Sequence, residues 1–450
     1  MGTFQTANVQ MPGVPTSSVR SANAPGAHHR ALRFLTAGSV DDGKSTLIGR
    51  LLYDSRAILA DQLANLQAKA AGAAVDLSLL TDGLEAEREQ GITIDVAYRY
   101  FATRQRKFII ADAPGHEQYT RNMVTAAAGS DAAVVLVDLT KLDTSRSPVR
   151  LLMQTRRHAL LANLLRVPSI VFAVNKLDAV EQPEAAFHAV REALLAFADQ
   201  AGIEVAGIIP VSALNGDNVT RPLEAPWYVG PSLLQRLESL PATQEPRDGA
   251  LLLPVQYVSR EGEGTGHQPR ILWGRIARGR VRKGDAVQVF PSRETANVVD
   301  LLVASDVVEA AMAGQSAGLL LDRQLDVSRG DWIAAPGSIE TAREFSATLA
   351  WLDTEPAVVG RKYRLRHGSR WVQARIAAIE SRLDIHSLAA TDAHELAVND
   401  IGRVTVQVQE PLPVLSYQES RVGGALIVTD PTSNRTSGAL LVEALADAAG

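Results

Sequence analysis

Two short strings in the first half of the chain carry polar residues at spacings that suit a nucleotide. Residues 38–45 read Gly-Ser-Val-Asp-Asp-Gly-Lys-Ser, which has the form G-x-x-x-x-G-K-[ST]. Glycines at Gly38 and Gly43 let the backbone turn close to phosphate oxygens. Lys44 supplies a cation for the β- and γ-phosphates, and the Ser45 hydroxyl suits Mg²⁺. A second string, residues 175–178 (Asn-Lys-Leu-Asp), is where we expect the base to be read.

The base is predicted from hydrogen-bonding chemistry. The carboxylate of Asp178 can accept from both N1–H and the exocyclic amine of guanine, a donor pair that adenine lacks. Asn175 and Lys176 are expected to brace the base and the loops. Residues 212–214 (Ser-Ala-Leu) follow an apolar run, and we expect the backbone N–H of Ala213 to donate to guanine O6. The sequence therefore predicts a GTP site.

Hydrolysis is predicted from residues 112–116, Asp-Ala-Pro-Gly-His. We expect Asp112 to hold a Mg²⁺-bound water, Gly115 to donate its N–H to the γ-phosphate, and His116 to orient the attacking water. Thr93 lies between this string and the phosphate loop, where a threonine can bind Mg²⁺ and order its segment when triphosphate is present. The plainer alternatives are a Gly-rich turn, a β-prone threonine and a structural histidine.

The candidate site thus comprises GTP and Mg²⁺ contacts with one catalytic residue, His116. The expected GTP contacts are Gly38, Ser39, Val40, Asp41, Asp42, Gly43, Lys44, Ser45, Thr46, Asp112, Ala113, Pro114, Gly115, His116, Asn175, Lys176, Asp178, Ser212, Ala213 and Leu214. The expected metal ligands are Ser45, Thr93 and, through a water molecule, Asp112.

Apolar runs precede these polar strings and are expected to form the strands that position them. The runs are Leu32–Ala37, Lys107–Ala111, Ala132–Val137, Ser169–Val174 and Ile203–Val211. Helical patterns lie between them, from near Lys44 and over Glu184–Gln200. Alternating strands and helices predict a mostly parallel sheet with helices on both faces. Ligands of such sheets bind at the carboxyl ends of the strands, where every one of these motifs falls.

The pattern changes near Pro241, beyond which strand-like runs alternate with Gly, Asp and Pro. Such runs predict small β-barrels or sandwiches. The predicted fold is an α/β P-loop GTPase domain followed by two β-barrel domains. We expect a disordered tail over residues 1–30, a GTP-binding domain over 31–241, and barrels over 250–338 and 342–450.

Composition narrows the function classes. The 450 residues contain no cysteine, which excludes disulfides, thiol catalysis and cysteine-bound iron–sulfur clusters and is typical of a cytoplasmic protein. No apolar run approaches the roughly 20 residues of a membrane span. The net charge of −5 gives no overall basic field for nucleic acid. We therefore expect a cytoplasmic protein without a membrane or nucleic-acid partner.

The motifs also resemble a known family. Residues 112–116 and 85–95 (Glu-Ala-Glu-Arg-Glu-Gln-Gly-Ile-Thr-Ile-Asp) are similar to translation-factor GTPases, especially the elongation factor 1α branch. Residues 38–42 differ, because translation factors usually carry Gly-His-Val-Asp-His there. Residues 108–123, 155–158 (Thr-Arg-Arg-His), 226–234 and 399–404 resemble the GTPase subunit of bacterial sulfate adenylyltransferase. Residues 139–153 and 270–275 depart from that family's pattern.

The resemblance implies a transferase of sulfate assimilation. A smaller ATP-using catalytic subunit would form adenylyl sulfate and diphosphate from ATP and sulfate, and this chain would couple GTP hydrolysis to that reaction in a heterodimer or higher complex. The sequence contains no second G-x-x-x-x-G-K-[ST], so we expect no fused adenylyl-sulfate kinase. Two alternatives remain: an elongation-factor-like GTPase that binds tRNA or the ribosome, and a stand-alone regulatory GTPase.

Overall fold

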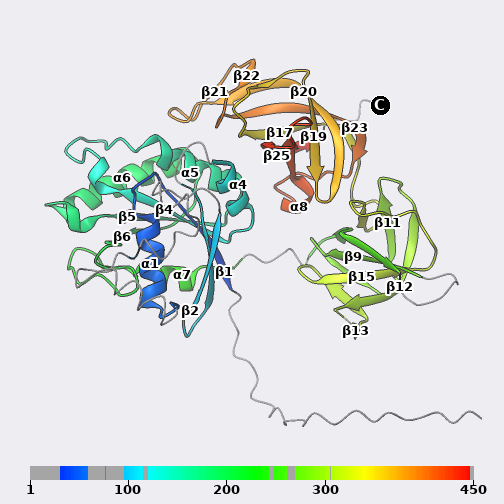
Figure 1. Cartoon of the computed structure of the whole chain (residues 1–450), viewed down its shortest axis with the longest axis horizontal. Coiled ribbons are helices and arrows are strands. Elements are labelled where there is room, and N and C mark those ends of the chain that lie inside the picture. Colours follow the sequence, from blue (N-terminus) through cyan, green and yellow to red (C-terminus); the bar gives the residue numbers. More distant parts are fainter. Residues whose placement is uncertain are drawn as a thin grey trace, which may run out of the picture.

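The structure is a computed structural model that describes residues 31–58, 77, 96–114, 120–242, 248–260, 269–304 and 306–445. The tail expected over residues 1–30 lies outside these described residues. The described chain forms an α/β part followed by two all-β parts (Figure 1). Their limits as domains stay a prediction.

The α/β part alternates strands and helices, as the apolar runs predict. Its elements are β1 (Leu32–Ala37), α1 (Lys44–Asp54), β2 (Ala97–Ala102), β3 (Lys107–Asp112), α4 (Thr120–Ala128), β4 (Ala132–Asp138), η3 (Leu139–Lys141), α5 (Met153–Leu164), β5 (Ser169–Asn175), η4 (Leu177–Ala179), α6 (Pro183–Gln200), β6 (Val205–Pro210) and α7 (Leu233–Ser239).

Six strands form one sheet in the order β2-β3-β1-β4-β5-β6, in which only the β2–β3 pair is antiparallel among the described residues. Every residue of β4 and β5 is buried. One face of the sheet packs against α1 and α7, and the other against α4, α5 and α6. Both faces are therefore covered, which is why the central strands are continuous apolar runs rather than alternating ones.

The first all-β part contains an eight-stranded sheet. Its strands are β7 (Leu252–Pro254), β8 (Tyr257–Arg260), β9 (Arg270–Arg275), β11 (Ala286–Phe290), β12 (Thr295–Val303), β13 (Asp306–Val307), β15 (Ser316–Leu321) and β16 (Trp332–Ala334), and β10 (Arg280–Arg282) pairs with β14 (Ala310–Met312) separately.

The second all-β part contains a seven-stranded sheet with longer strands than the sequence predicts. Its elements are β17 (Ala342–Trp351), β18 (Ala357–Val358), β19 (Lys362–His367), β20 (Arg370–Leu383), β21 (Ala390–Thr391), β22 (Glu395–Leu396), β23 (Ile401–Leu412), α8 (Arg421–Gly424), β24 (Ala425–Thr429) and β25 (Thr436–Leu445). The 14-residue β20 pairs with β23 through two register shifts. Such bulges bend a strand and help a sheet curl.

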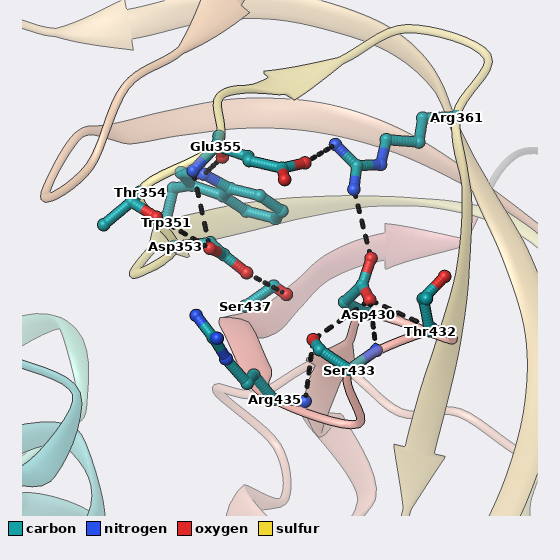
Figure 2. A network of polar contacts seen from close by, with 10 residues as sticks. All are labelled: Trp351, Asp353, Thr354, Glu355, Arg361, Asp430, Thr432, Ser433, Arg435 and Ser437. Carbon is teal, nitrogen blue, oxygen red and sulfur yellow. Dashed lines mark hydrogen bonds and ion pairs between the residues drawn. The ribbon is translucent and has the colours of Figure 1, made fainter.

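A polar network holds the turn between β24 and β25 (Figure 2). The carboxylate of Asp430 accepts from the backbone N–H groups of Thr432 and Ser433, at 2.9 and 2.7 Å. The guanidinium of Arg361 contacts Asp430 at 3.1 Å and Glu355 at 2.7 Å. This cation, the residue before β19, is therefore neutralised within the chain.

The second all-β part contacts both other parts. The Tyr417 hydroxyl donates to the Leu165 carbonyl at 2.8 Å, just beyond α5. The Arg278 guanidinium of the first all-β part pairs with Glu419. Between the two all-β parts, the Trp332 and His367 rings stack with centroids 4.6 Å apart. Segment 417–419 thus lies against the α/β part and the first all-β part together.

The buried ring of His367 predicts a pH dependence of stability. Burial lowers the pKa of His367 from 6.5 to about 4, despite its hydrogen bond to the Gly423 carbonyl. Between pH 6.5 and 4 the unfolded state therefore binds a proton that the folded state rejects. Above pH 6.5 this effect does not lower the free energy of unfolding. As the pH falls from 6.5 to 4, the free energy of unfolding decreases by about 3 kcal/mol because of His367.

The expected result is that a His367→Phe variant loses less unfolding free energy than the parent protein between pH 6.5 and 4.5. Urea titrations at several pH values measure this difference in slope. A His394→Phe variant is the matched control, because His394 is exposed. Equal slopes for His367→Phe and the parent protein would exclude this role of the ring.

Candidate functional site

The phosphate loop joins β1 to α1 at the carboxyl edge of the sheet. Gly43 is the residue before α1 and has φ 93°, a left-handed conformation that favours glycine. A Cβ atom built on Gly43 would lie 2.4 Å from Nδ2 of Asn175, so glycine is also required for space. Asp41 has φ 64° in the same loop. The loop therefore brings the amino end of α1 to the sheet edge, where backbone N–H groups attract anions.

The Lys44 ammonium lies over this loop. Its Nζ atom donates to the Gly38 and Ser39 carbonyls at 2.9 and 2.8 Å. Burial lowers the pKa of Lys44, and the nearby Asp112 carboxylate opposes that shift. Ser45 and Thr46 follow in the first turn of α1, where both are half-buried. The cation is thus held where the sequence predicts the phosphates.

The end of β3 places Asp112 beside the loop. Asp112 is buried, and its Oδ1 atom accepts from the Thr36 hydroxyl of β1 at 3.2 Å. Ala113 and Pro114 follow the strand. The Asp112 carboxylate and the Ser45 hydroxyl are oxygen donors of the kind that Mg²⁺ prefers, so these residues fit the predicted metal.

Three predicted residues fall outside the described residues: Thr93, Gly115 and the catalytic candidate His116. Their assignments stay predictions from the sequence.

One side chain joins the two ends of the site. The buried Asn175 amide, at the end of β5, donates from Nδ2 to the Asp42 carbonyl at 2.8 Å. Its Oδ1 atom accepts from the backbone N–H of Ala213 at 2.9 Å. The phosphate loop and the loop after β6 are therefore held together through one amide. The Ala213 N–H, expected to face guanine O6, donates to Asn175 in this structure.

The predicted base-reading residues lie next to each other. The Asp178 carboxylate is exposed and accepts from the Ser212 hydroxyl at 2.5 Å. The Ser212 oxygen in turn accepts from the backbone N–H of Asn215 at 3.1 Å. Leu214 is also exposed. The Ser212 hydroxyl thus orients the Asp178 carboxylate at the rim of the site, although the two residues are 34 positions apart in the sequence.

A series of alternating acidic and basic side chains lies beside the phosphate loop, and the sequence did not suggest it. The Asp42 side chain is fully buried and accepts from the Ser39 N–H at 2.6 Å. Its other oxygen pairs with Lys141, in η3, at 2.8 Å. Lys141 lies 3.8 Å from Asp138, which pairs with Lys176 at 2.7 Å. Burial raises the pKa of Asp138, but hydrogen bonds from Lys176 and Thr140 outweigh it and hold this pKa below its usual value.

Comparison with known proteins places this site in a family. The model of the elongation factor Tu GTP binding domain matches residues 29–252, and that of the GTP-eEF1A C-terminal domain-like family matches 344–443. The chain is 43% identical to sulfate adenylyltransferase subunit 1 of Laribacter hongkongensis, over 93% of this chain and 86% of that protein.

The chain belongs to the sulfate adenylyltransferase subunit 1 family.

Other members of this family extend the likeness. The subunit 1 protein of Citrobacter koseri is 42% identical over 92% of this chain and 86% of its own length. The bifunctional enzyme CysN/CysC of Xylella fastidiosa is 46% identical over 91% of this chain but is longer, so that only 65% of it is matched. The fold of this family is the predicted P-loop GTPase domain followed by β-barrels. Among the described residues, no helix is long and apolar enough to cross a membrane.

For a member of this family, the charges beside the loop lead to a prediction about GTP affinity. Lys141 compensates a buried carboxylate inside a loop that should surround a triphosphate. A Lys141→Met variant leaves the Asp42 charge unpaired there, and we expect GTP to bind about 30-fold more weakly or worse. A double variant, Asp42→Asn with Lys141→Met, should recover most of the affinity, because the amide oxygen can still accept from Ser39. Calorimetric titration measures both.

The matched control is Lys283→Met, which removes an exposed lysine paired with Asp300 at 2.7 Å in the first all-β part. Its GTP affinity should equal that of the parent protein. If Lys141→Met behaves like this control, or if the double variant binds no better than Lys141→Met, charge compensation is not the role of Lys141.

Proposed function

We propose that this chain is the GTP-hydrolysing subunit of a sulfate adenylyltransferase and couples GTP hydrolysis to adenylyl sulfate synthesis by a smaller, ATP-using catalytic subunit. The observation that carries the proposal is the 43% identity to a subunit 1 protein over 93% of this chain. That likeness reaches from the phosphate loop through both all-β parts. The name "subunit 1" itself implies a partner subunit.

The proposed roles in hydrolysis rest on the sequence motifs and, for the described residues, on their contacts at the carboxyl edge of the sheet. Backbone N–H groups of residues 38–43 and the Lys44 ammonium bind the phosphates, and Asp178 reads guanine. Ser45, Thr93 and, through water, Asp112 would hold Mg²⁺, which offsets charge on the phosphate oxygens. His116 orients a water whose oxygen attacks the γ-phosphorus. The bond from that phosphorus to the β–γ bridging oxygen breaks, giving GDP and inorganic phosphate.

Coupling needs contacts through which the state of the GTP site can reach the rest of the chain. The guanidinium of Arg156, in α5, donates to the carbonyls of Ile385 and His386 in the second all-β part, at 3.1 and 2.8 Å. The Tyr417 hydroxyl contact with Leu165 lies at the other end of α5. These contacts support a rigid connection between the GTP-binding part and that barrel, so that a change at one is felt at the other.

The test is the final yield of adenylyl sulfate from the mixed subunits with ATP and sulfate. GTP and a non-hydrolysable analogue are each supplied to the parent protein and to His116→Ala. Only the parent protein with GTP should exceed the ATP-only yield. His116→Ala should still bind GTP while hydrolysing it about 100-fold more slowly or worse. His394→Ala, which changes an exposed histidine in the second all-β part, is the control and should behave like the parent protein.

The same yield in all four cases would show that GTP cleavage does not drive synthesis. The proposal would then fail in its coupling, even with an intact GTP site.

A further inference from the structure

A cluster of cations lies on the outward face of the second all-β part. Side chains alternate between the two faces of a strand. On β19 the outward set contains Lys362, Arg364 and Arg366, which alternate with buried residues. On β20 it contains Trp371 and Arg375, and the residues between them alternate in the same way, with Val372 and Ala374 buried. The register places Arg366 opposite Trp371 and Lys362 opposite Arg375. We call these five residues the Trp371 face.

The centre of the Trp371 face is aromatic. Trp371 is 42% exposed, and the guanidinium carbons of Arg364 and Arg366 lie 4.8 and 5.7 Å from its ring centroid. Ile427 of β24 pairs with Arg366 and is 40% exposed. Exposed tryptophan and arginine side chains are enriched at the centres of protein interfaces. The face therefore offers apolar area surrounded by fixed positive charge.

The four cations of the Trp371 face form no ion pair within the described residues. They are Lys362, Arg364, Arg366 and Arg375, and the Arg375 guanidinium donates to the neutral amide of Gln407 at 2.6 and 2.9 Å. Arg361, directly before β19, contrasts with them, because it pairs with Glu355 and Asp430 (Figure 2). Like charges opposite each other destabilise a sheet. An external acidic surface would relieve that repulsion.

We propose that the Trp371 face binds an acidic surface of the smaller catalytic subunit. The identity of that partner rests on the proposed function, whereas its chemistry follows from this face: carboxylates around an apolar pocket that receives Trp371. A protein fits better than a nucleic acid, because arginine side chains already lie over the indole that a base would need for stacking.

The test is a pair of double charge reversals. Arg364→Glu with Arg366→Glu changes two arginines at alternate positions of β19. The control, Arg280→Glu with Arg282→Glu, makes the same change at alternate exposed positions of β10 in the first all-β part. The dissociation constant for the purified catalytic subunit is measured by calorimetry at two salt concentrations. Thermal unfolding and GTP affinity confirm that both variants are folded.

We expect the β19 variant to bind the catalytic subunit about 30-fold more weakly or worse, and the β10 variant to bind like the parent protein. The parent complex should weaken with salt, and the β19 variant should lose that dependence. Equal affinities for both variants would overturn the assignment of this face. So would binding of a 20-base-pair DNA duplex by the parent protein that the β19 reversal removes. If the parent protein itself does not bind the catalytic subunit, both this assignment and the proposed partner fail.

Discussion

A Lys44→Ala variant is expected to lose productive GTP binding, with affinity reduced about 100-fold or more. The Lys44 ammonium is buried and donates to two loop carbonyls, so it is already fixed where the phosphates should bind. Each hydrogen bond to a charged group contributes about 1.5–3 kcal/mol, and a triphosphate offers at least two acceptors. Calorimetric titration with GTP and Mg²⁺ measures the loss.

Lys107→Ala is the matched control for this result. Lys107 is exposed at the start of β3, the strand whose other end carries Asp112. The control should bind GTP like the parent protein. Thermal unfolding should show both variants folded, because removing a buried cation also removes its desolvation cost. Unchanged affinity in a folded Lys44→Ala variant would show that the loop backbone alone holds the triphosphate.

An Asp178→Asn variant is expected to change the base that the site selects. The Asp178 carboxylate, oriented by the Ser212 hydroxyl, faces outward at the rim of the site. Its two acceptors match the N1–H and amine of guanine. Xanthine has a carbonyl in place of that amine, which the asparagine N–H can meet. GTP affinity should fall about 100-fold, while xanthosine triphosphate should become the better ligand.

Asp199→Asn, an exposed aspartate in the last turn of α6, makes the same chemical change away from the site and should keep its preference for GTP. The measurement is competition between GTP and xanthosine triphosphate for each variant. A persistent preference for GTP in Asp178→Asn would mean that Asp178 does not read the base edge.

Strands that are buried on both faces were predictable from the sequence. Leu32–Ala37 and Ser169–Asn175 are mostly apolar, because helices cover both sides of the sheet. The edge strand β2 was not predicted. It carries the exposed Tyr98 and Tyr100, and its apolar pattern is weak because only one side is covered. The length of β20 was also missed, because its register shifts interrupt the alternation that marks a strand.

The candidate site was likewise predictable from the sequence only in part. Local strings such as residues 38–45 and 175–178 are visible because their spacing itself carries the chemistry. The pairing of Asp42 with Lys141 was not visible, since the two residues are 99 positions apart and neither charge is unusual by itself. The signal that could have indicated it is the second acidic residue of the loop, which requires a cation if it is buried beside phosphates.

The contact between Gly43 and Asn175 constrains how this sequence can evolve. A Cβ atom at Gly43 would lie 2.4 Å from Nδ2 of Asn175, and Asn175 in turn holds the loops at both ends of the site. A mutation that enlarges position 43 therefore needs a simultaneous change at 175, and that change releases Ala213. If the two positions change one after the other, we expect the intermediate variant to bind nucleotide poorly. Positions 43 and 175, far apart in the chain, are therefore expected to change together rather than independently.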